Sequence, residues 1–174
     1  MSEPSMPDKQ RFLTLSVDEA IRGARAGQGG PFGTVVVKDG VVIAKAANAV
    51  IANNDPTAHA EVQAIRAACA TLASFQLDGC DVYASCEPCP MCLGALLWAR
   101  PRAVYYAATR QDAAAAGFDD AVFYQTLGVG AGCSAGDVGA VSGPCPPLAR
   151  THVPSDRAGE PFAVYATMPS KIRY

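Results

Sequence analysis

The amino-acid sequence predicts an α/β fold in which helices cover a central mixed sheet. Apolar residues recur at helical spacing over residues 8–26. A valine-rich run over residues 34–46 follows, with the turn pair Asp39-Gly40 at its middle, which is typical of a β-hairpin. Helical and strand-like stretches then alternate. The order helix, strand, strand, helix, strand, helix, strand is typical of such a sheet.

The first helix is expected to end at the glycine-rich segment "GQGGPFG", since Gly and Pro interrupt regular structure. Asn48 follows the second strand of the hairpin. Asp55 is a favourable N-cap and Pro56 a favourable first helical residue, so we expect the next helix to begin at Pro56.

The second half of the chain continues this pattern as far as residue 127. We expect strands over residues 81–86 and 103–108, separated by a helix that begins at Pro88 or Pro90. A short helix is expected over residues 120–127. Residues 128–147 show no periodicity, and we assign 128–160 to an irregular loop. The last segment, 161–174, is apolar enough to dock on the rest of the domain.

The composition is that of a single globular domain over residues 1–174, with 1–7 as a loose terminus. Half of the residues are hydrophobic, enough to build a core. The net charge of −2 gives no basic surface, which disfavours a nucleic-acid partner. No stretch is apolar enough to span a membrane, and no secretory leader follows Met1. We therefore expect a cytoplasmic protein.

Two short segments carry the candidate chemistry, His59-Ala60-Glu61 and Pro88-Cys89-Pro90-Met91-Cys92. One imidazole and two thiolates are the ligands of a catalytic zinc, which keeps its fourth position for water. His-x-Glu followed by Pro-Cys-x-x-Cys is the signature of zinc-dependent nucleobase deaminases. We expect His59, Cys89 and Cys92 to bind one Zn²⁺, with Glu61 as a proton shuttle. Both metal segments should lie in first helical turns, whose positive ends favour thiolates.

Two alternatives to an open zinc site are considered. Cys86 lies three residues before Cys89, so His59, Cys86, Cys89 and Cys92 could form a closed structural site without room for water. That alternative leaves Glu61 without a role. In the other, the cysteines are buried apolar thiols and His59 is a core histidine.

Four segments closely resemble the guanine deaminases of the cytidine deaminase-like, zinc-dependent family. They are residues 31–40, 54–69, 85–108 and 112–120, and the resemblance extends over about residues 8–127 without an obvious gap. It implies a three-layer α/β/α fold with a five-stranded mixed sheet. It does not cover residues 128–160.

The resemblance implies hydrolysis of guanine to xanthine and ammonia. Zinc-bound hydroxide would attack C2 while Glu61 transfers protons to ring N3 and to the departing ammonia. Asn48 and Asp120 would bind the base, with Asp119 the less favoured carboxylate, and the ring of Phe32 would pack against it. Guanine presents N–H donors, which a carboxylate such as that of Asp120 can accept.

Members of the family exchange their C-terminal segment between two subunits. The resemblance therefore implies a domain-swapped homodimer in which Tyr174 closes over the partner's site. For Phe32, Tyr174 and Trp98, simple packing or surface docking is an alternative, and it is the favoured one for the mid-helix Trp98.

Other interpretations stay open as well. Asn48 could form only a turn, and Asp120 could be only a favourable charge at a helix N-terminus. The substrate could instead be guanosine, ammeline, cytosine or adenosine in tRNA. A non-catalytic structural zinc module is the interpretation from a different class.

Overall fold

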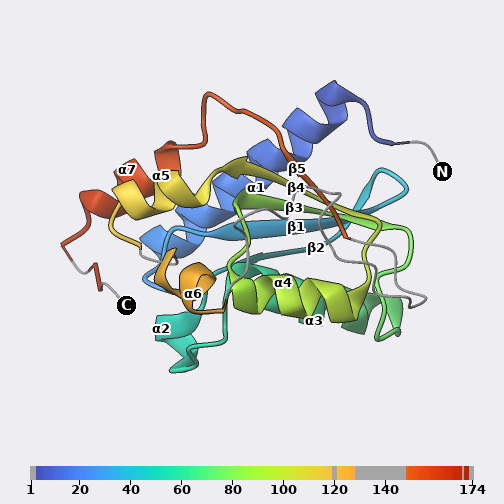
Figure 1. Ribbon diagram of the computed structural model, residues 1–174, viewed down its shortest axis with the longest axis horizontal. Helices are drawn as coiled ribbons and strands as arrows, with labels where there is room; N and C mark the ends of the chain where they lie inside the picture. The colour runs from blue at the N-terminus through green and yellow to red at the C-terminus, as the bar shows by residue number, and fades with distance from the viewer. Residues whose placement is uncertain (1–2, 119–120, 128–147, 170, 173–174) are drawn as a thin grey trace.

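The structure is a computed structural model that describes residues 3–118, 121–127, 148–169 and 171–172. Within these residues, five strands form one sheet in the order β2-β1-β3-β4-β5 (Figure 1). The strands are β1 (Gly33–Lys38), β2 (Val41–Ala47), β3 (Cys80–Cys86), β4 (Ala103–Ala108) and β5 (Ala149–His152). β1 pairs antiparallel with β2 and β3, whereas β3, β4 and β5 run parallel. The predicted mixed, five-stranded sheet is confirmed.

Helices cover both faces of this sheet (Figure 1). One face carries α1 (Met6–Arg25), α5 (Arg110–Ala115) and α7 (Glu160–Ala166). The other carries α3 (Ala60–Leu72) and α4 (Pro90–Ala99), with the short α2 (Val50–Asn53) and α6 (Ala121–Thr126) near the ends where α3 and α4 begin. The resulting three-layer arrangement is the predicted one. None of the helices in the described ranges is long and apolar enough to cross a bilayer.

Alternation along β1 divides the core between the two faces. Val35 packs in one cluster with Phe12 and Leu13 of α1, whereas Val36 packs with Ala64 of α3 and other residues on the opposite side. Successive side chains of a strand point to opposite faces, so the near-continuous valine run serves both layers.

The β1–β2 turn follows the prediction. Asp39 and Gly40 have φ angles of 51° and 76°, both in the left-handed region that a two-residue hairpin turn requires. This turn fixes the register in which β1 meets β2.

The helix predicted to begin at Pro56 begins four residues later, at Ala60, with His59 as its N-cap residue. The side chain of Asp55 accepts hydrogen bonds from the backbone N–H of Thr57 (2.8 Å) and from its hydroxyl (2.7 Å). Asp55 therefore closes a local turn around Pro56, and that turn satisfies the signals that indicated a helix start.

The structure also differs from the prediction near the C-terminus. Residues 149–152, placed in the predicted irregular loop 128–160, form the edge strand β5 beside β4. β5 is short and largely exposed, so its sequence has no alternating apolar pattern to reveal it. Residues 128–147 lie outside the described residues. The packing of α7 on α1 agrees with the predicted docking of the C-terminal segment.

Candidate active site

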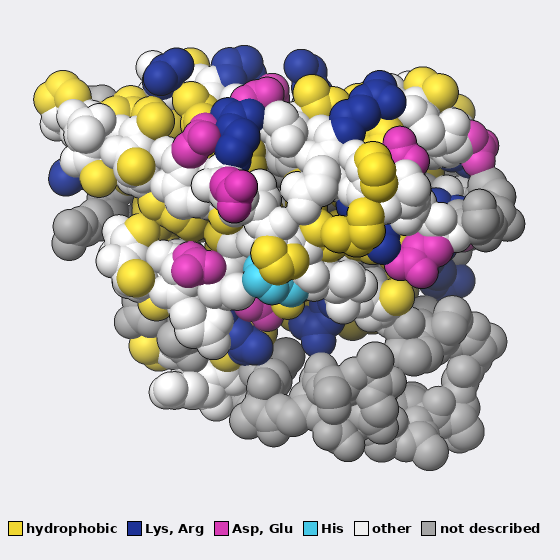
Figure 2. Space-filling model, turned by 90° about the horizontal axis from the view of Figure 1, so that it is seen from above, with side chains coloured by type: hydrophobic (Ala, Val, Ile, Leu, Met, Phe, Trp, Pro, Cys, Tyr) yellow, Lys and Arg dark blue, Asp and Glu magenta, His cyan; other side chains and the backbone are white. Residues whose placement is uncertain are grey.

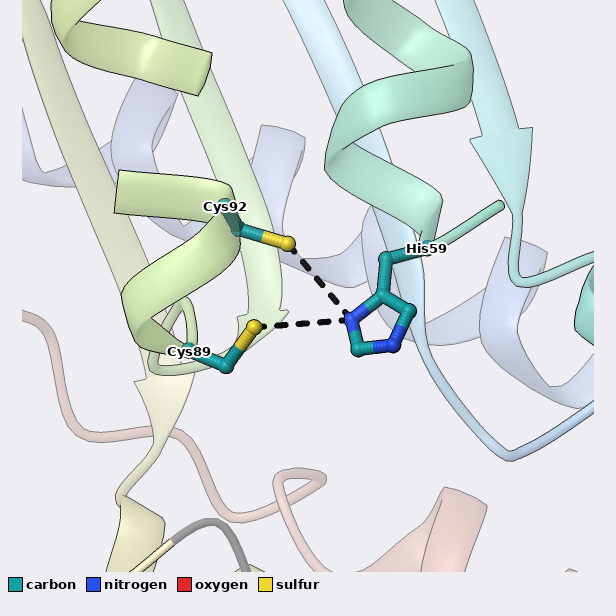
Figure 3. A group of neighbouring side chains, drawn as sticks. All are labelled: His59, Cys89 and Cys92. Atoms are coloured by element: carbon teal, nitrogen blue, oxygen red, sulfur yellow. Dashed lines mark hydrogen bonds between the residues drawn. The ribbon is translucent and has the colours of Figure 1, made fainter. Parts of the chain in front are cut away.

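The two candidate metal segments lie at the N-termini of neighbouring helices. His59 is the N-cap residue of α3 and Cys89 that of α4, while Cys92 lies in the first turn of α4. Neither cap residue uses its side chain to bond its own helix. Figure 3 shows the imidazole and both thiols pointing toward one another.

The distances in this group match those of a zinc site. The Nδ1 atom of His59 lies 3.5 Å from the sulfur of Cys89 and 3.5 Å from that of Cys92. A tetrahedral zinc about 2.0 Å from nitrogen and about 2.3 Å from sulfur sets those two atoms about 3.5 Å apart. The donor atoms and their spacing therefore fit Zn²⁺.

Cys86 does not belong to this group. Among the residues that the structure describes, the candidate metal ligands that cluster are His59, Cys89 and Cys92. The thiol of Cys86 instead donates to the carbonyl oxygen of Thr109 at 3.6 Å and is buried beside Phe118. The arrangement supplies three ligands, as an open site requires, and does not support the closed four-ligand alternative.

The two thiols of the metal group shift each other's pKa in opposite directions. A hydrogen bond with Cys92 lowers the pKa of Cys89, and the same bond raises the pKa of Cys92. The imidazole of His59 also lowers the pKa of Cys89. A divalent cation displaces protons from such thiols when it binds, so this pair is suited to bind one.

Glu61 is buried in the first turn of α3, beside the metal group. Its carboxylate oxygen Oε2 lies 3.4 Å from the thiol of Cys92, which donates to it. Burial and, to a smaller extent, the nearby charge of Cys89 raise the pKa of Glu61 to about 7, against the opposing effect of His59. A carboxyl group with a pKa near neutrality can both accept and release a proton under ordinary conditions.

A cavity of about 540 Å³ opens over these residues. This volume is within the range of small-molecule sites, which are mostly apolar with a few polar groups. The polar lining consists of Asn48, His59, Glu61, Glu87 and Cys89, and the rest is aromatic, aliphatic or proline. His59 and Cys89 of the metal group therefore lie in the wall of a pocket large enough for a small planar ring.

Two of the four predicted substrate-binding residues line this cavity. The side chain of Asn48 is buried, and its Oδ1 accepts a hydrogen bond from the backbone N–H of Val50 at 3.2 Å. Asn48 thus closes a turn, as the alternative interpretation expected, and also faces the pocket. The ring of Phe32 meets that of Phe118 edge-on, with centroids 5.0 Å apart. Asp120, its neighbour Asp119 and Tyr174 lie outside the described residues.

Several pocket residues were missed in the sequence. Glu87, Phe118, Phe123 and Leu127 all line the cavity. Glu87 stands directly before Pro88-Cys89, and its place at the end of an apolar strand was a usable signal. Phe123 and Leu127 are four apart, a spacing that puts both on one face of a short helix.

Trp98 does not contribute to the pocket, and it does not pack into the core. Its side chain is 81% exposed on the outer surface of α4. Core packing is therefore excluded, and surface docking of Trp98 stays a prediction.

Comparisons with known proteins place the chain among deaminases. The family model for the zinc-binding region of cytidine and deoxycytidylate deaminases matches residues 6–108. The chain is 59% identical over 118 residues to guanine deaminase of Bacillus subtilis, a match that spans 68% of this chain and 76% of that protein. It is 44% identical over 103 residues to the tRNA-specific adenosine deaminase of Agrobacterium fabrum, spanning 59% of this chain and 67% of that protein.

The fold comparison agrees. The X-ray structure of Bacillus subtilis guanine deaminase superposes with a TM-score of 0.66 and 47% identity, covering 94% of this chain and 97% of that one. The similarity thus extends beyond the metal-binding segments to the sheet and its covering helices.

Proposed function

This chain belongs to the zinc-binding cytidine and deoxycytidylate deaminase family, and from that premise we propose that it hydrolyses guanine to xanthine and ammonia. One observation carries the proposal: three zinc-type ligands converge, and two of them, His59 and Cys89, line one small, mostly apolar cavity together with the buried Glu61. The 59% identity to a guanine deaminase supports guanine as the base.

In this proposal His59, Cys89 and Cys92 hold Zn²⁺ and Glu61 moves protons. When bound, zinc supplies a Lewis acid that makes water a nucleophile near neutral pH. Glu61 takes one proton from the attacking water and delivers it to ring N3 as the C2–O bond forms. It then carries the second proton of that water to the departing amino group. The C2–N bond breaks in this second stage and ammonia leaves, so one water is consumed for each ammonia released.

The remaining pocket residues would hold the ring. Phe32 and Phe118 offer apolar aromatic surface, and Asn48 adds a polar side chain to the lining of the cavity. Asp120 would accept from the N–H groups of guanine, and Tyr174 would close the site. These last two roles rest on the resemblance of their segments to the family.

Adenosine in tRNA is the second candidate substrate, because a tRNA-specific relative is 44% identical over 103 residues. Binding of tRNA depends on basic surface that neutralises phosphates. On the face covered by α1, acidic and basic side chains are interspersed (Figure 2). Together with the net charge of −2, this mixture favours a free base.

A domain-swapped homodimer in the cytoplasm completes the proposal. The side chains of Leu97 and Trp98 on α4 are exposed and apolar, and burial against a second copy would remove them from water. Size-exclusion chromatography with light scattering tests this. A monomer at all concentrations contradicts the dimer.

The function is tested by measuring ammonia release from the zinc-loaded protein with guanine, guanosine, ammeline, cytosine and tRNA in parallel. We expect turnover of guanine with a kcat/KM at least about 100-fold above that of the others, because a pocket's unpaired polar groups penalise the wrong ring. Turnover of tRNA alone would contradict the proposal, and so would the absence of ammonia release from every substrate.

A further inference from the structure

Helix α6 forms part of the cavity wall although little of it is buried. Phe123 of α6 and Leu127, directly after it, line the cavity, yet both are more than half exposed. Among the α6 side chains that the structure describes, Tyr124 is the buried one, with 4% of its surface exposed. The position of this wall therefore depends on what Tyr124 contacts.

Tyr124 connects α6 to the segment that carries a metal ligand. Its hydroxyl donates to the carbonyl oxygen of Pro88 at 2.5 Å, and Pro88 directly precedes Cys89. The guanidinium of Arg110 lies over the ring of Tyr124, 4.4 Å from its centroid, at cation–π distance. Two separate contacts thus hold one ring in place.

Arg110 is in turn fixed by a buried carboxylate. Its Nε lies 3.4 Å from Oε2 of Glu87, and its backbone N–H donates to the same oxygen at 3.1 Å. The side chain of Glu87 is 8% exposed and lines the cavity. A buried carboxylate without a partner is costly, so Glu87 and Arg110 constrain each other.

We propose that Glu87, Arg110 and Tyr124 are positioning residues that set the α6 wall at a fixed distance from the metal group and thereby determine how tightly a planar base fits. This inference rests on the proposed function for its substrate. The wall touches the base in the ground state and in the transition state alike. Loss of its position should therefore raise KM more than it lowers kcat.

The chain offers a matched control for the ion pair. Arg102 donates from Nε to Oδ1 of Asp81 at 2.8 Å. The exposed fractions are 30% for Arg102 and 4% for Asp81, close to the 27% and 8% of Arg110 and Glu87. Asp81 lies in β3 opposite Ala103 of β4, and Arg102 directly precedes β4. This pair therefore lies at the other end of β3 and β4 from Glu87 and Arg110, and it does not line the cavity. Loss of the Arg102–Asp81 ion pair therefore measures the effect on stability of losing such a pair away from the cavity.

The kinetic experiment compares Tyr124→Phe, Arg110→Met and Arg102→Met with the zinc-loaded parent. Tyr124→Phe removes the hydroxyl alone and keeps the ring, so it is the variant least able to disturb folding. We expect both wall variants to raise the KM for guanine about fivefold, the size typical of losing one hydrogen bond, with kcat within about twofold. Arg102→Met should lower the melting temperature and leave KM unchanged. Unchanged KM in both wall variants, or an equal rise in Arg102→Met, overturns the inference.

Hydrogen exchange supplies a readout that does not depend on catalysis. Peptides covering residues 121–126 should exchange faster in Tyr124→Phe and Arg110→Met, whereas peptides of α4 and the metal content stay as in the parent. Unchanged exchange in α6 overturns the inference even if guanine is the substrate. If the parent does not turn over guanine but residues 121–126 exchange faster in the two wall variants, the proposed function fails and the positioning role stands.

Discussion

Glu61 illustrates how burial prepares a single residue for chemistry. The chain places this carboxyl group in the first turn of α3, away from water and beside the thiol of Cys92. Burial raises its pKa to about 7, so the group can exchange protons near neutral pH. On the surface, a glutamate would stay ionised and would be a poor donor.

Replacement of Glu61 by glutamine tests this role at the residue scale. The amide has the size of the carboxyl group, and Glu61 is not one of the three metal ligands, so fold and zinc should be retained. We expect kcat to fall by about 10²–10⁴-fold, because general acid–base transfer is lost. The measurements are ammonia release, metal content and melting temperature on one preparation. A variant that keeps half of the parent's kcat would remove Glu61 from the mechanism.

Gly29 is a second residue whose identity matters for the pocket. A Cβ atom at this position would lie 2.1 Å from Oδ1 of Asn48, a distance that real Cβ atoms do not show. Gly29→Ala must therefore push the side chain of Asn48, which lines the cavity. We expect the KM for guanine to rise about tenfold, since one base-binding contact is misplaced.

Gly159→Ala is the matched control for that change, because an added Cβ there meets no atom within 4 Å. Steady-state kinetics give the KM for guanine of both variants, and circular dichroism checks that both are folded. Equal KM values in Gly29→Ala and the parent would show that Asn48 does not contact the base.

At the scale of elements, the short helix α5 is held by a side-chain cap next to the pocket. α5 begins with a capping box in which the Thr109 hydroxyl accepts from the Asp112 N–H and the Asp112 carboxylate accepts from the Thr109 N–H. Because Arg110 is the first residue of α5, this cap also fixes the helix end that carries Arg110. Local capping and pocket geometry are thus coupled.

Thr109→Ala should lower the free energy of unfolding by about 1 kcal/mol, the usual cost of losing an N-cap side chain. Urea denaturation at neutral pH measures the change. Thr126→Ala provides the comparison, since its hydroxyl bonds the carbonyl of Val122 within α6 and caps no helix N-terminus. An equal loss in both variants would mean that the capping box contributes nothing of its own.

Sequence patterns predicted elements whose signals are local. The hairpin turn at Asp39-Gly40 depends only on the backbone angles of these two residues, and the metal motif depends only on the spacing of its residues. Both could therefore be predicted from the sequence. The start of α3 was predicted too early, because Asp55 uses its side chain for a turn rather than a cap. β5 was not predicted, since the strand is specified by the open edge of β4 rather than by its own residues. The wall residue Tyr124 depends on Pro88, 36 positions away, which no local pattern reveals.

At the scale of the whole molecule, the metal group joins two helices of one layer that are distant in sequence. His59 begins α3 and Cys89 begins α4, and both helices pack on the same face of the sheet. Zn²⁺ bound by this group therefore cross-links two helix ends, and its binding free energy adds to the stability of the folded chain.

Removal of zinc with a chelator should accordingly lower the melting temperature by about 10 °C. Ligand at about 1,000 times its dissociation constant stabilises by about 4 kcal/mol, and about 1 kcal/mol shifts the melting temperature of a chain this size by about 2–4 °C. Re-addition of Zn²⁺ should restore the original value. Cys89→Ala, which lacks one ligand, should already melt low and respond little to the chelator, whereas Cys86→Ala should respond like the parent because its thiol bonds Thr109 instead. If Cys86→Ala also lost its response, the site would have four protein ligands and no position for water, and the hydrolytic mechanism would have to be abandoned.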